Sequence, residues 1–437
     1  MSAAMKIEPL SSDRTMSLPP LPKGWEWQRF ADHCDRVSVG HVGPTSEFFC
    51  PRSEGVILIR SQDVRPGRLM HETAAAVTPT FHAKLKKSKL QPGDILFVRV
   101  GANRGDCCVV PTGIEELNCA NIVFARPRVK NGFFGFYFRS PLGQSHLLAA
   151  TTGAAQGVIN TGSVAEMPVP VPPLPVQRRI AGILSAYDDL IENSQRRIRL
   201  LEDMARALYR EWFVHFRFPG HESVPRIPSA LGDIPQGWEV KKLSEIADVN
   251  RAQINARTAP EELHYIDISS VSPGQIDSST TYAFADAPGR ARRIVQHGDI
   301  LWSCVRPNRR SHALVMHPEP DTIASTGFAV LTPSKVPFPF LYFATTTDEF
   351  VKFLENSATG AAYPAVSAKT FEEADLLVPP SNMLEAFAKS AIPMAEETHT
   401  LHLQIQNLRR TRDLLLPRLL SGQVALDSSL NFTHDVA

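Results

Sequence analysis

The segment PLPVQRRIAGILSAYDDLIENSQRRIRLLEDMARALYREWF (173–213) places mostly apolar side chains at alternating steps of four and three residues. A 3.5-residue spacing is typical of the seam of a coiled coil. Pro175 lies just before the seam, where proline is tolerated at the start of a helix. The sequence therefore predicts a long spacer helix over 176–216. Its seam includes Ile180, Leu184, Tyr187, Ile191, Ile198, Leu201 and Leu208.

A shift of about 207 residues brings this seam onto a second one in the same register, which predicts a second helix over 381–423. The second seam includes Leu401, Ile405, Leu408 and Leu415. Pro393 and Pro417 are expected to kink or end this helix, and Thr398 and Arg412 occupy seam positions, which weakens it. We expect the two helices to pack on each other; the alternative is that each covers only its own domain.

Outside the helices, the chain repeats itself in the same order. LPKGWEW (21–27) returns as IPQGWEV (234–240), QPGDILF (91–97) as QHGDILW (296–302), and TGAAQGVIN (152–160) as TGAAYPAVS (359–367). Such order indicates a tandem duplication with approximate two-fold symmetry, and the period is far too long for a solenoid.

Each copy begins with short β-rich runs, such as VILIRSQDV (56–64) and LHYIDISSV (263–271), bounded by Gly and Pro. GDILFVRV (93–100) and GDILWSCV (298–305) open with a Gly-Asp turn and continue as β-rich runs. The predicted fold is mixed α/β (α+β), with irregular sheets in two domains over 21–175 and 234–380. The remaining segments are predicted to be a tail over 1–20, a linker over 217–233 and a C-terminal tail over 424–437.

The composition of the 437 residues, with 43% hydrophobic and 21% charged residues, is that of a globular protein. No run approaches the ~18–20 apolar residues of a membrane span, and no secretory signal pattern occurs, so we expect a cytoplasmic location and no membrane partner. The six cysteines form no Cys-x-x-Cys pair, so neither a metal site nor a disulfide framework is expected.

The sequence holds no catalytic motif that we can identify. It has no phosphate-binding loop of the Gly-x-x-x-x-Gly-Lys-Ser/Thr type, no Gly-x-Gly-x-x-Gly after a strand and no His-Glu-x-x-His. We therefore expect no intrinsic catalysis and no cofactor bound by this chain.

Local charge is more informative than the net charge of +1. Windows 84–104 and 290–310 each hold six Lys or Arg residues against a single Asp, and both surround the repeated Gly-Asp-Ile-Leu. Two equivalent basic patches suit two contacts on a polyanion. The candidates for phosphate contacts are Lys86, Lys87, Lys89, Arg292 and Arg293.

Each basic window contains a short turn, VGANRG (100–105) or VRPNRR (305–310). Arginine and asparagine can bind guanine and adenine bidentately in the major groove of DNA. The alternative is that these are solvated turn residues, since turns favour asparagine. The candidates for base contacts are Arg99, Asn103 and Arg104 in the first domain and Arg306, Asn308, Arg309 and Arg310 in the second. Gln156 and Tyr363, in the repeated TGAA segments, could also contact bases or could serve packing.

Taken together, the (L/I)PxGWE starts, the Gly-Asp-Ile-Leu segments, TGAA followed by VPP, and the long helix after each VPP resemble the specificity subunit of a type I restriction–modification enzyme. The resemblance covers about residues 20–425. It implies two target recognition domains held apart by two helices, each domain reading one half of a split, asymmetric site on double-stranded DNA.

The resemblance also implies partners. Two methyltransferase subunits would form an adenine-N6 modification enzyme with this chain, and restriction subunits would complete the complex in a bacterium or archaeon. S-adenosylmethionine, ATP and Mg²⁺ would belong to those partners. Two alternatives are a specificity subunit whose partner fuses restriction and modification, and a coiled-coil scaffold that does not bind DNA.

Overall fold

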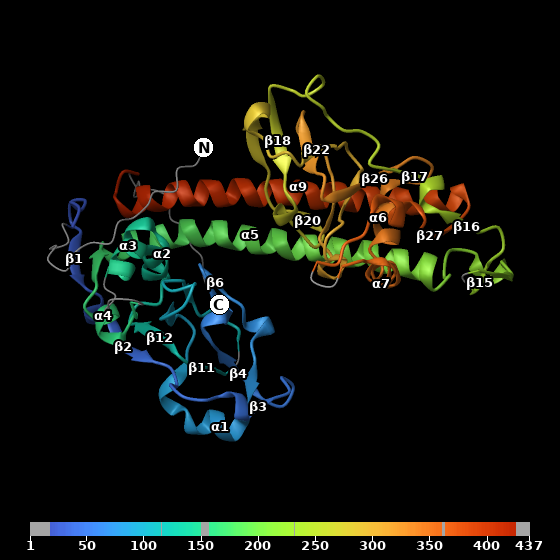
Figure 1. Cartoon of the computed structure of the whole chain (residues 1–437). Coiled ribbons are helices and arrows are strands. Elements are labelled where there is room, and N and C mark those ends of the chain that lie inside the picture. The colour runs from blue at the N-terminus through green and yellow to red at the C-terminus, as the bar shows by residue number, and fades with distance from the viewer. Residues whose placement is uncertain (1–17, 115, 150–156, 231, 361–362, 425–437) are drawn as a thin grey trace. The chain divides into compact units, whose positions relative to one another are not determined.

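The computed structural model describes residues 18–114, 116–149, 157–230, 232–360 and 363–424. The chain divides into two compact units, which are Met1–Glu192 with Gln406–Ala437, and Asn193–Ile405. Two long helices, α5 (Leu174–Tyr209) and α9 (Ser381–Leu420), contribute to both units (Figure 1).

The first unit is built on an antiparallel four-stranded sheet in the order β10-β9-β12-β2. Its strands are β2 (Cys34–Val39), β9 (Ile95–Val98), β10 (Cys107–Val109) and β12 (Ile122–Pro127). All four residues of β9 are buried, because Ile95 and Phe97 enter one apolar cluster while Leu96 and Val98 enter another. A strand covered on both faces reads as a continuous apolar run, which explains why the repeated segment lacks alternation.

A second, five-stranded sheet of this unit has the order β3-β7-β4-β11-β8 and includes one parallel pair, β4 with β11. The strands are β3 (Phe49–Cys50), β4 (Val56–Ile59), β7 (Ala76–Val77), β8 (Lys89–Leu90) and β11 (Leu117–Cys119). Shorter elements complete the unit: β1 (Glu26–Arg29) with β13 (Pro168–Val171), β5 (Val64–Arg65) with β6 (Arg68–Leu69), α1 (Pro79–Lys84), α2 (Phe133–Arg139), α3 (Pro141–Ala149) and α4 (Thr161–Ala165).

The second unit has a four-stranded antiparallel sheet in the order β17-β26-β23-β24, whose central strands again feed two apolar clusters. The strands are β17 (Ala247–Val249), β23 (Ile300–Ser303), β24 (His312–Leu314) and β26 (Phe328–Pro333). Taken in order from the opposite edge, as β24-β23-β26-β17, its strands correspond one by one to β10-β9-β12-β2 of the first unit. The Gly-Asp-Ile-Leu segment leads into the central strands β9 and β23, as the sequence predicts.

The other sheet of this unit has the order β21-β18-β25-β22, with β18 parallel to β25. The strands are β18 (Glu262–Ile266), β21 (Thr280–Ala283), β22 (Ala291–Ile294) and β25 (Thr322–Ser325). The remaining elements are the pairs β14 (Arg226–Ser229) with β15 (Gly232–Pro235), β16 (Glu239–Lys242) with β27 (Asp375–Val378) and β19 (Val271–Ser272) with β20 (Gln275–Ile276), and the helices α6 (Phe338–Thr345), α7 (Asp348–Ser357) and α8 (Ala368–Glu372). Strand β14 and the start of β15 lie in the second half of the segment predicted as a linker.

Within each unit, α5 and α9 run antiparallel. In the first unit, Ile180 and Leu184 share an apolar cluster with Leu416, Leu419 and Leu420, and further along α5 Asp188 pairs with Arg412. In the second unit, Arg197 pairs with Glu397, and the Tyr209 ring centre lies 6.1 Å from that of Phe387. The predicted seam positions Ile180, Leu184, Ile191, Ile198, Leu401 and Ile405 are buried, and Tyr187, Leu201, Leu208, Leu408 and Leu415 are half-buried.

The second helix does not end at Pro393, whereas Pro417 lies close to its end. α9 continues through Pro393, and Pro417 lies in its last turn. A proline costs about 3 kcal/mol inside a helix, but the buried side chains on both sides of Pro393, Ala391 and Leu401, hold the helix in place through packing.

Arg412 does not weaken the seam either, because its charge is compensated. Its guanidinium binds Asp188 of α5 at 2.6 Å and Asp413 at 2.8 Å. Asp188 also accepts a bond from Arg139 of α2 at 2.7 Å. A half-buried ionic cluster therefore occupies the place of an apolar contact.

None of the helices in the described ranges is long and apolar enough to cross a membrane. The six cysteines are all free thiols, and four of them are buried. Burial raises the pKa of the Cys107 thiol to about 12, so this side chain serves as a small apolar group.

Candidate nucleic-acid interface

In the first unit, the turn between β9 and β10 contains three of the predicted base-contacting residues. The backbone N–H of Val98 donates to Asp106 at 2.9 Å, and that of Gly105 donates to Val98 at 3.1 Å, which closes the hairpin. Gly101 and Gly105 have φ angles of +90° and +95°, a conformation that glycine adopts without strain. Asn103 is exposed at the tip of this turn.

The two arginines of this turn hold a distant segment of the same unit. Arg99 donates from Nε to the carbonyl of Ile159 at 3.3 Å and from Nη1 to the Asn121 side chain at 3.1 Å. Arg104 donates from Nη1 to the carbonyl of Gly157 at 2.7 Å. Both side chains are half-buried, so they position the end of the first TGAA segment beside the turn.

In the second unit, the turn after β23 is a short 3₁₀ segment, Pro307–Arg309, flanked by Arg306 and Arg310. Both flanking residues have positive φ angles, 52° and 53°. This conformation is uncommon outside glycine and tends to occur at functional positions. Asn308 and Arg309 are exposed at the tip.

The flanking arginines of this turn also have partners. The guanidinium carbon of Arg306 lies 4.7 Å from the centre of the Tyr363 ring, and its backbone N–H donates to Pro364 at 2.7 Å. Arg310 forms an ion pair with Asp348 at the start of α7. The second TGAA segment is thereby held against the turn, as in the first unit.

One backbone hydrogen bond is common to both units at equivalent positions. Ile159 N–H donates to the Arg99 carbonyl at 3.2 Å, and Val366 N–H donates to the Cys304 carbonyl at 2.9 Å. The four residues follow the repeat, with offsets of 207 and 205. Each unit therefore assembles a turn and a TGAA segment that are more than fifty residues apart in sequence.

The remaining candidates lie in other parts of their units. Lys86 and Lys87 are exposed in the 3₁₀ segment Lys86–Ser88, and Lys89 in β8 pairs with Glu116 at 3.3 Å. These lysines belong to the five-stranded sheet rather than to the turn after β9. Gln156 lies outside the described residues, whereas Tyr363 is 69% exposed.

Arg292 and Arg293 are half-buried in β22, at the edge of the second sheet of their unit. The guanidinium carbon of Arg292 lies 5.4 Å from the centre of the Phe284 ring. Burial raises the pKa of the Cys304 thiol to about 11, and the positive charge of Arg293 opposes this effect. The charge of Arg293 thus acts on Cys304, the residue that directly follows β23.

The Asp residues of the repeated Gly-Asp-Ile-Leu support both turns, but their surroundings differ. Asp94 is fully buried, receives the Gln91 N–H at 2.8 Å and forms a bidentate pair with Arg126 at 2.8 Å. Asp299 receives the Gln296 N–H at 2.9 Å. In β26, Thr332 occupies the position that Arg126 holds in β12, since Ala329 pairs with Trp302 as Val123 pairs with Phe97. Burial raises the pKa of Asp299 to about 6.

The sequence reasoning found the two turns, because their motifs repeat, but it missed the groups that hold them. Asn121, Gly157 and Asp348 are far from the turns in sequence. The repeated TGAA segment was the only signal that could have placed Ile159 and Val366 beside the turns.

Two mixed α/β units have the same topology, and in each a backbone hydrogen bond joins the turn to the segment that follows the TGAA repeat. Together they define an internally duplicated fold. Residues 77–203 match the family model described as the type I restriction modification DNA specificity domain. A crystal structure of a type I restriction–modification system S subunit from M. genitalium has the same fold, with a TM-score of 0.57 and 16% sequence identity, covering 90% of this chain and 96% of that one.

Curated proteins of similar sequence carry related descriptions. The chain is 23% identical to the type I restriction enzyme MjaIX specificity subunit of Methanocaldococcus jannaschii, over 70% of this chain and 72% of the relative. It is 20% identical to the HindI specificity subunit of Haemophilus influenzae, over 84% of this chain and 94% of the relative. The chain is therefore similar to type I restriction–modification specificity subunits over most of its length.

Proposed function

We propose that this chain is a non-catalytic DNA-specificity subunit that reads a bipartite, asymmetric site on double-stranded DNA. The unit of β9 would read one half-site and the unit of β23 the other. The observation that supports this most strongly is the equivalent turn in both units, with Asn103 exposed at one tip and Asn308 at the other.

The chemistry of the tips fits direct base reading. An exposed asparagine can bond to N6 and N7 of adenine, and the exposed Arg309 can bond to O6 and N7 of guanine. Arg99, Arg104 and Arg306 would shape the surface, since their side chains are engaged with the TGAA segments. The exposed Lys86 and Lys87 would bind phosphates, which sets orientation rather than sequence preference.

The proposed partners are inferred from the similarity to type I specificity subunits. Methyltransferase subunits, expected to be two, would dock on this chain to methylate adenine N6, and restriction subunits would join them in the cytoplasm of a bacterium or archaeon. S-adenosylmethionine, ATP and Mg²⁺ would be bound by those subunits. The helices α5 and α9, which belong to both units, would set the length of the unread gap.

The test is a domain swap in the assembled methyltransferase. Residues 21–175 are replaced by the corresponding domain of a relative with a different known target, and the methylated sites are mapped by long-read sequencing. We expect one half of the methylated motif to change and the other half to be retained. A change in both halves, or in neither, would refute the assignment of one half-site to each unit.

A second measurement tests DNA binding directly. The affinity of the assembled complex for its target duplex should fall linearly with salt concentration on logarithmic axes, as phosphate contacts require. A chain that acts only as a protein scaffold would add no target preference to its partners at any salt concentration.

A further inference from the structure

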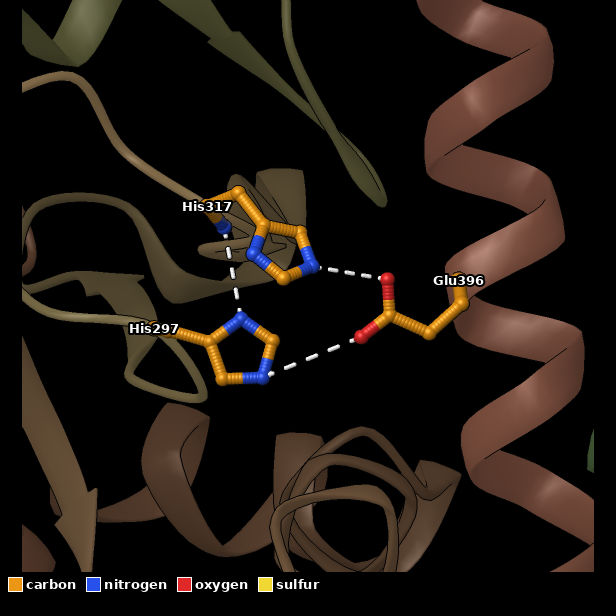
Figure 2. A group of neighbouring side chains, drawn as sticks. All are labelled: His297, His317 and Glu396. Atoms are coloured by element: carbon orange, nitrogen blue, oxygen red, sulfur yellow. Dashed lines mark hydrogen bonds and ion pairs between the residues drawn. The ribbon is translucent and has the colours of Figure 1, made fainter.

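A cluster of metal-ligating side chains lies in the second unit, away from the turn that carries Asn308. His297, His317 and Glu396 each offer one ligand atom, and these atoms all lie within 4.8 Å of one another. His317 Nε2 is 2.7 Å from one Glu396 carboxylate oxygen, and His297 Nε2 is 3.9 Å from the other. Figure 2 shows both imidazole rings directed toward the carboxylate of α9.

The two histidines are held side by side by the backbone of the central sheet. His297 precedes β23 and His317 follows β24, and these strands are paired. Beyond the strand ends, Gly298 N–H donates to Val315 and Val315 N–H donates to Asp299, both at 2.8 Å. As a result the two ring centres are 4.4 Å apart.

The backbone at His317 is in an unusual conformation, with φ at +43°. A histidine in this region is uncommon, and such residues tend to occur where a side chain is aimed for function. Here the conformation turns the His317 ring toward α9, where it meets Glu396. It also places the His317 N–H 3.3 Å from His297 Nδ1.

A fourth candidate ligand lies one helical turn beyond Glu396. Residues three apart on a helix share a face, and the ring centre of His399 is 5.4 Å from that of His317. The group therefore contains three imidazoles and one carboxylate, drawn from two turns of the sheet and one helix.

We propose that His297, His317 and Glu396 bind a divalent zinc ion, with His399 or water as the fourth ligand. Imidazole nitrogen and carboxylate oxygen are ligands that zinc takes in tetrahedral sites, whereas Ca²⁺ and Mg²⁺ select oxygen ligands alone. No sequence motif indicates this site, because residues 297, 317 and 396 have no recognisable zinc spacing.

Binding requires a modest rearrangement. Tetrahedral ligands at about 2.0–2.1 Å from zinc are roughly 3.4 Å apart, so the side chains must move closer together. They are free to do so, since the His297, His317 and Glu396 side chains are 39%, 55% and 39% exposed. Binding through His297 Nε2 also moves the ring proton to Nδ1 and breaks the 3.3 Å contact with the His317 N–H.

The consequence is a metal link between the sheet that carries the second turn and helix α9. His297 and His317 lie beyond the paired ends of strands β23 and β24, and Glu396 belongs to the helix. Zinc would therefore fix the sheet of the second unit to the portion of α9 that packs within the same unit.

The experiment uses the full-length chain without a histidine tag, freed of metal by chelation. Zn²⁺ binding is measured by calorimetry, and Co²⁺ is added in parallel because its visible absorption reports tetrahedral coordination. We expect one binding site, and we expect His317→Ala and Glu396→Gln each to weaken Zn²⁺ affinity at least tenfold and to abolish the Co²⁺ absorption. Circular dichroism checks that each variant is folded. Glu396→Gln is nearly isosteric at a half-buried helix position and should leave the fold intact.

The matched control is His264→Ala. His264 also pairs with a surface glutamate of the same unit, Glu319 at 3.3 Å, but has no second histidine in its pair. It should retain wild-type Zn²⁺ affinity. Equal Zn²⁺ affinity in the wild type and Glu396→Gln, or equal losses in His264→Ala and His317→Ala, would overturn the proposal, because zinc would then bind surface histidines without selection.

Discussion

The guanidinium of Arg306 lies over the ring of Tyr363, with its carbon 4.7 Å from the ring centre. Arg306 belongs to the turn after β23 and Tyr363 to the second TGAA segment, so the contact joins two repeated motifs that the sequence places 57 positions apart. It holds an arginine with a positive φ angle beside the exposed tip of the turn.

Replacing Tyr363 should impair the half-site that the second unit reads. A cation–π contact at an exposed site contributes about 0.5–1 kcal/mol, so we expect Tyr363→Ala to weaken target DNA binding about two- to five-fold. Tyr363→Phe keeps the ring and should bind like the wild type. Fluorescence anisotropy of the assembled methyltransferase on its target duplex measures both; equal losses in the two variants would show that the hydroxyl, not the ring, matters.

Truncating the exposed asparagines should affect one half-site each. A bidentate base contact contributes roughly 1–3 kcal/mol of discrimination, so Asn103→Ala should relax sequence preference in one half of the motif and Asn308→Ala in the other. Mapping of methylated sites measures the effect, and each variant is the control for the other. Relaxation of the same half by both variants would contradict the assignment.

Replacement of the buried aspartates Asp299 and Asp94 by asparagine should change the free energy of unfolding at pH 8 in opposite directions. The folded-state pKa of Asp299 is about 6, above its ordinary value of 3.8, because burial disfavours the charged form. The folded state therefore holds the proton more tightly, and the free energy of unfolding should fall by up to about 3 kcal/mol as pH rises from 4 to above 6. Asp299→Asn should remove this loss and stabilise the protein at pH 8 but not at pH 4.

Asp94→Asn is the matched variant in the first unit. It breaks a buried ion pair with Arg126, which typically costs about 3–5 kcal/mol because one charge is left without its partner. Urea unfolding at pH 4 and pH 8 compares the two variants. A stabilising Asp94→Asn, or an Asp299→Asn that destabilises at pH 8, would contradict the account of these sites.

The half-buried ionic cluster of Asp188, Arg139 and Arg412 should contribute to the stability of the fold. Asp188→Asn leaves Arg139 without its carboxylate partner and Arg412 with Asp413 alone. We expect the free energy of unfolding to fall by about 1–3 kcal/mol. Asp203→Asn is the control, since its pair with Arg206 is exposed and such pairs contribute little. Similar effects of the two substitutions on urea unfolding would show that burial of the Asp188 cluster is unimportant.

Pro393 interrupts the hydrogen bonding of α9 without ending the helix. Pro393→Ala restores a backbone N–H and has no apolar contact to lose, because Pro393 is exposed. We expect a gain of roughly 1–3 kcal/mol in the free energy of unfolding, up to the difference between proline and alanine in helices. Thermal unfolding measures this gain; a lower melting temperature would indicate that the proline shapes the helix for another purpose.

The sequence predicted the elements whose signals are local or repeated. The helix of Leu174–Tyr209 followed from its 3.5-residue spacing, and the central strands β9 and β23 followed from the repeated Gly-Asp-Ile-Leu runs. Repetition also located Asn103 and Asn308. The sequence misjudged α9, because helix propensity penalises Pro393 while packing of the neighbouring apolar positions, which a propensity argument omits, stabilises the helix.

What the sequence determined by itself was the duplication, the helical seams and the identity of the two turns, because these depend on spacing along the chain. Only the tertiary structure decided which arginines are engaged, which aspartate keeps a charged partner, and that His297, His317 and Glu396 meet. Those relationships join residues that are far apart in sequence, and pairing of strands and packing of helices bring them together without leaving a pattern in the order of amino acids.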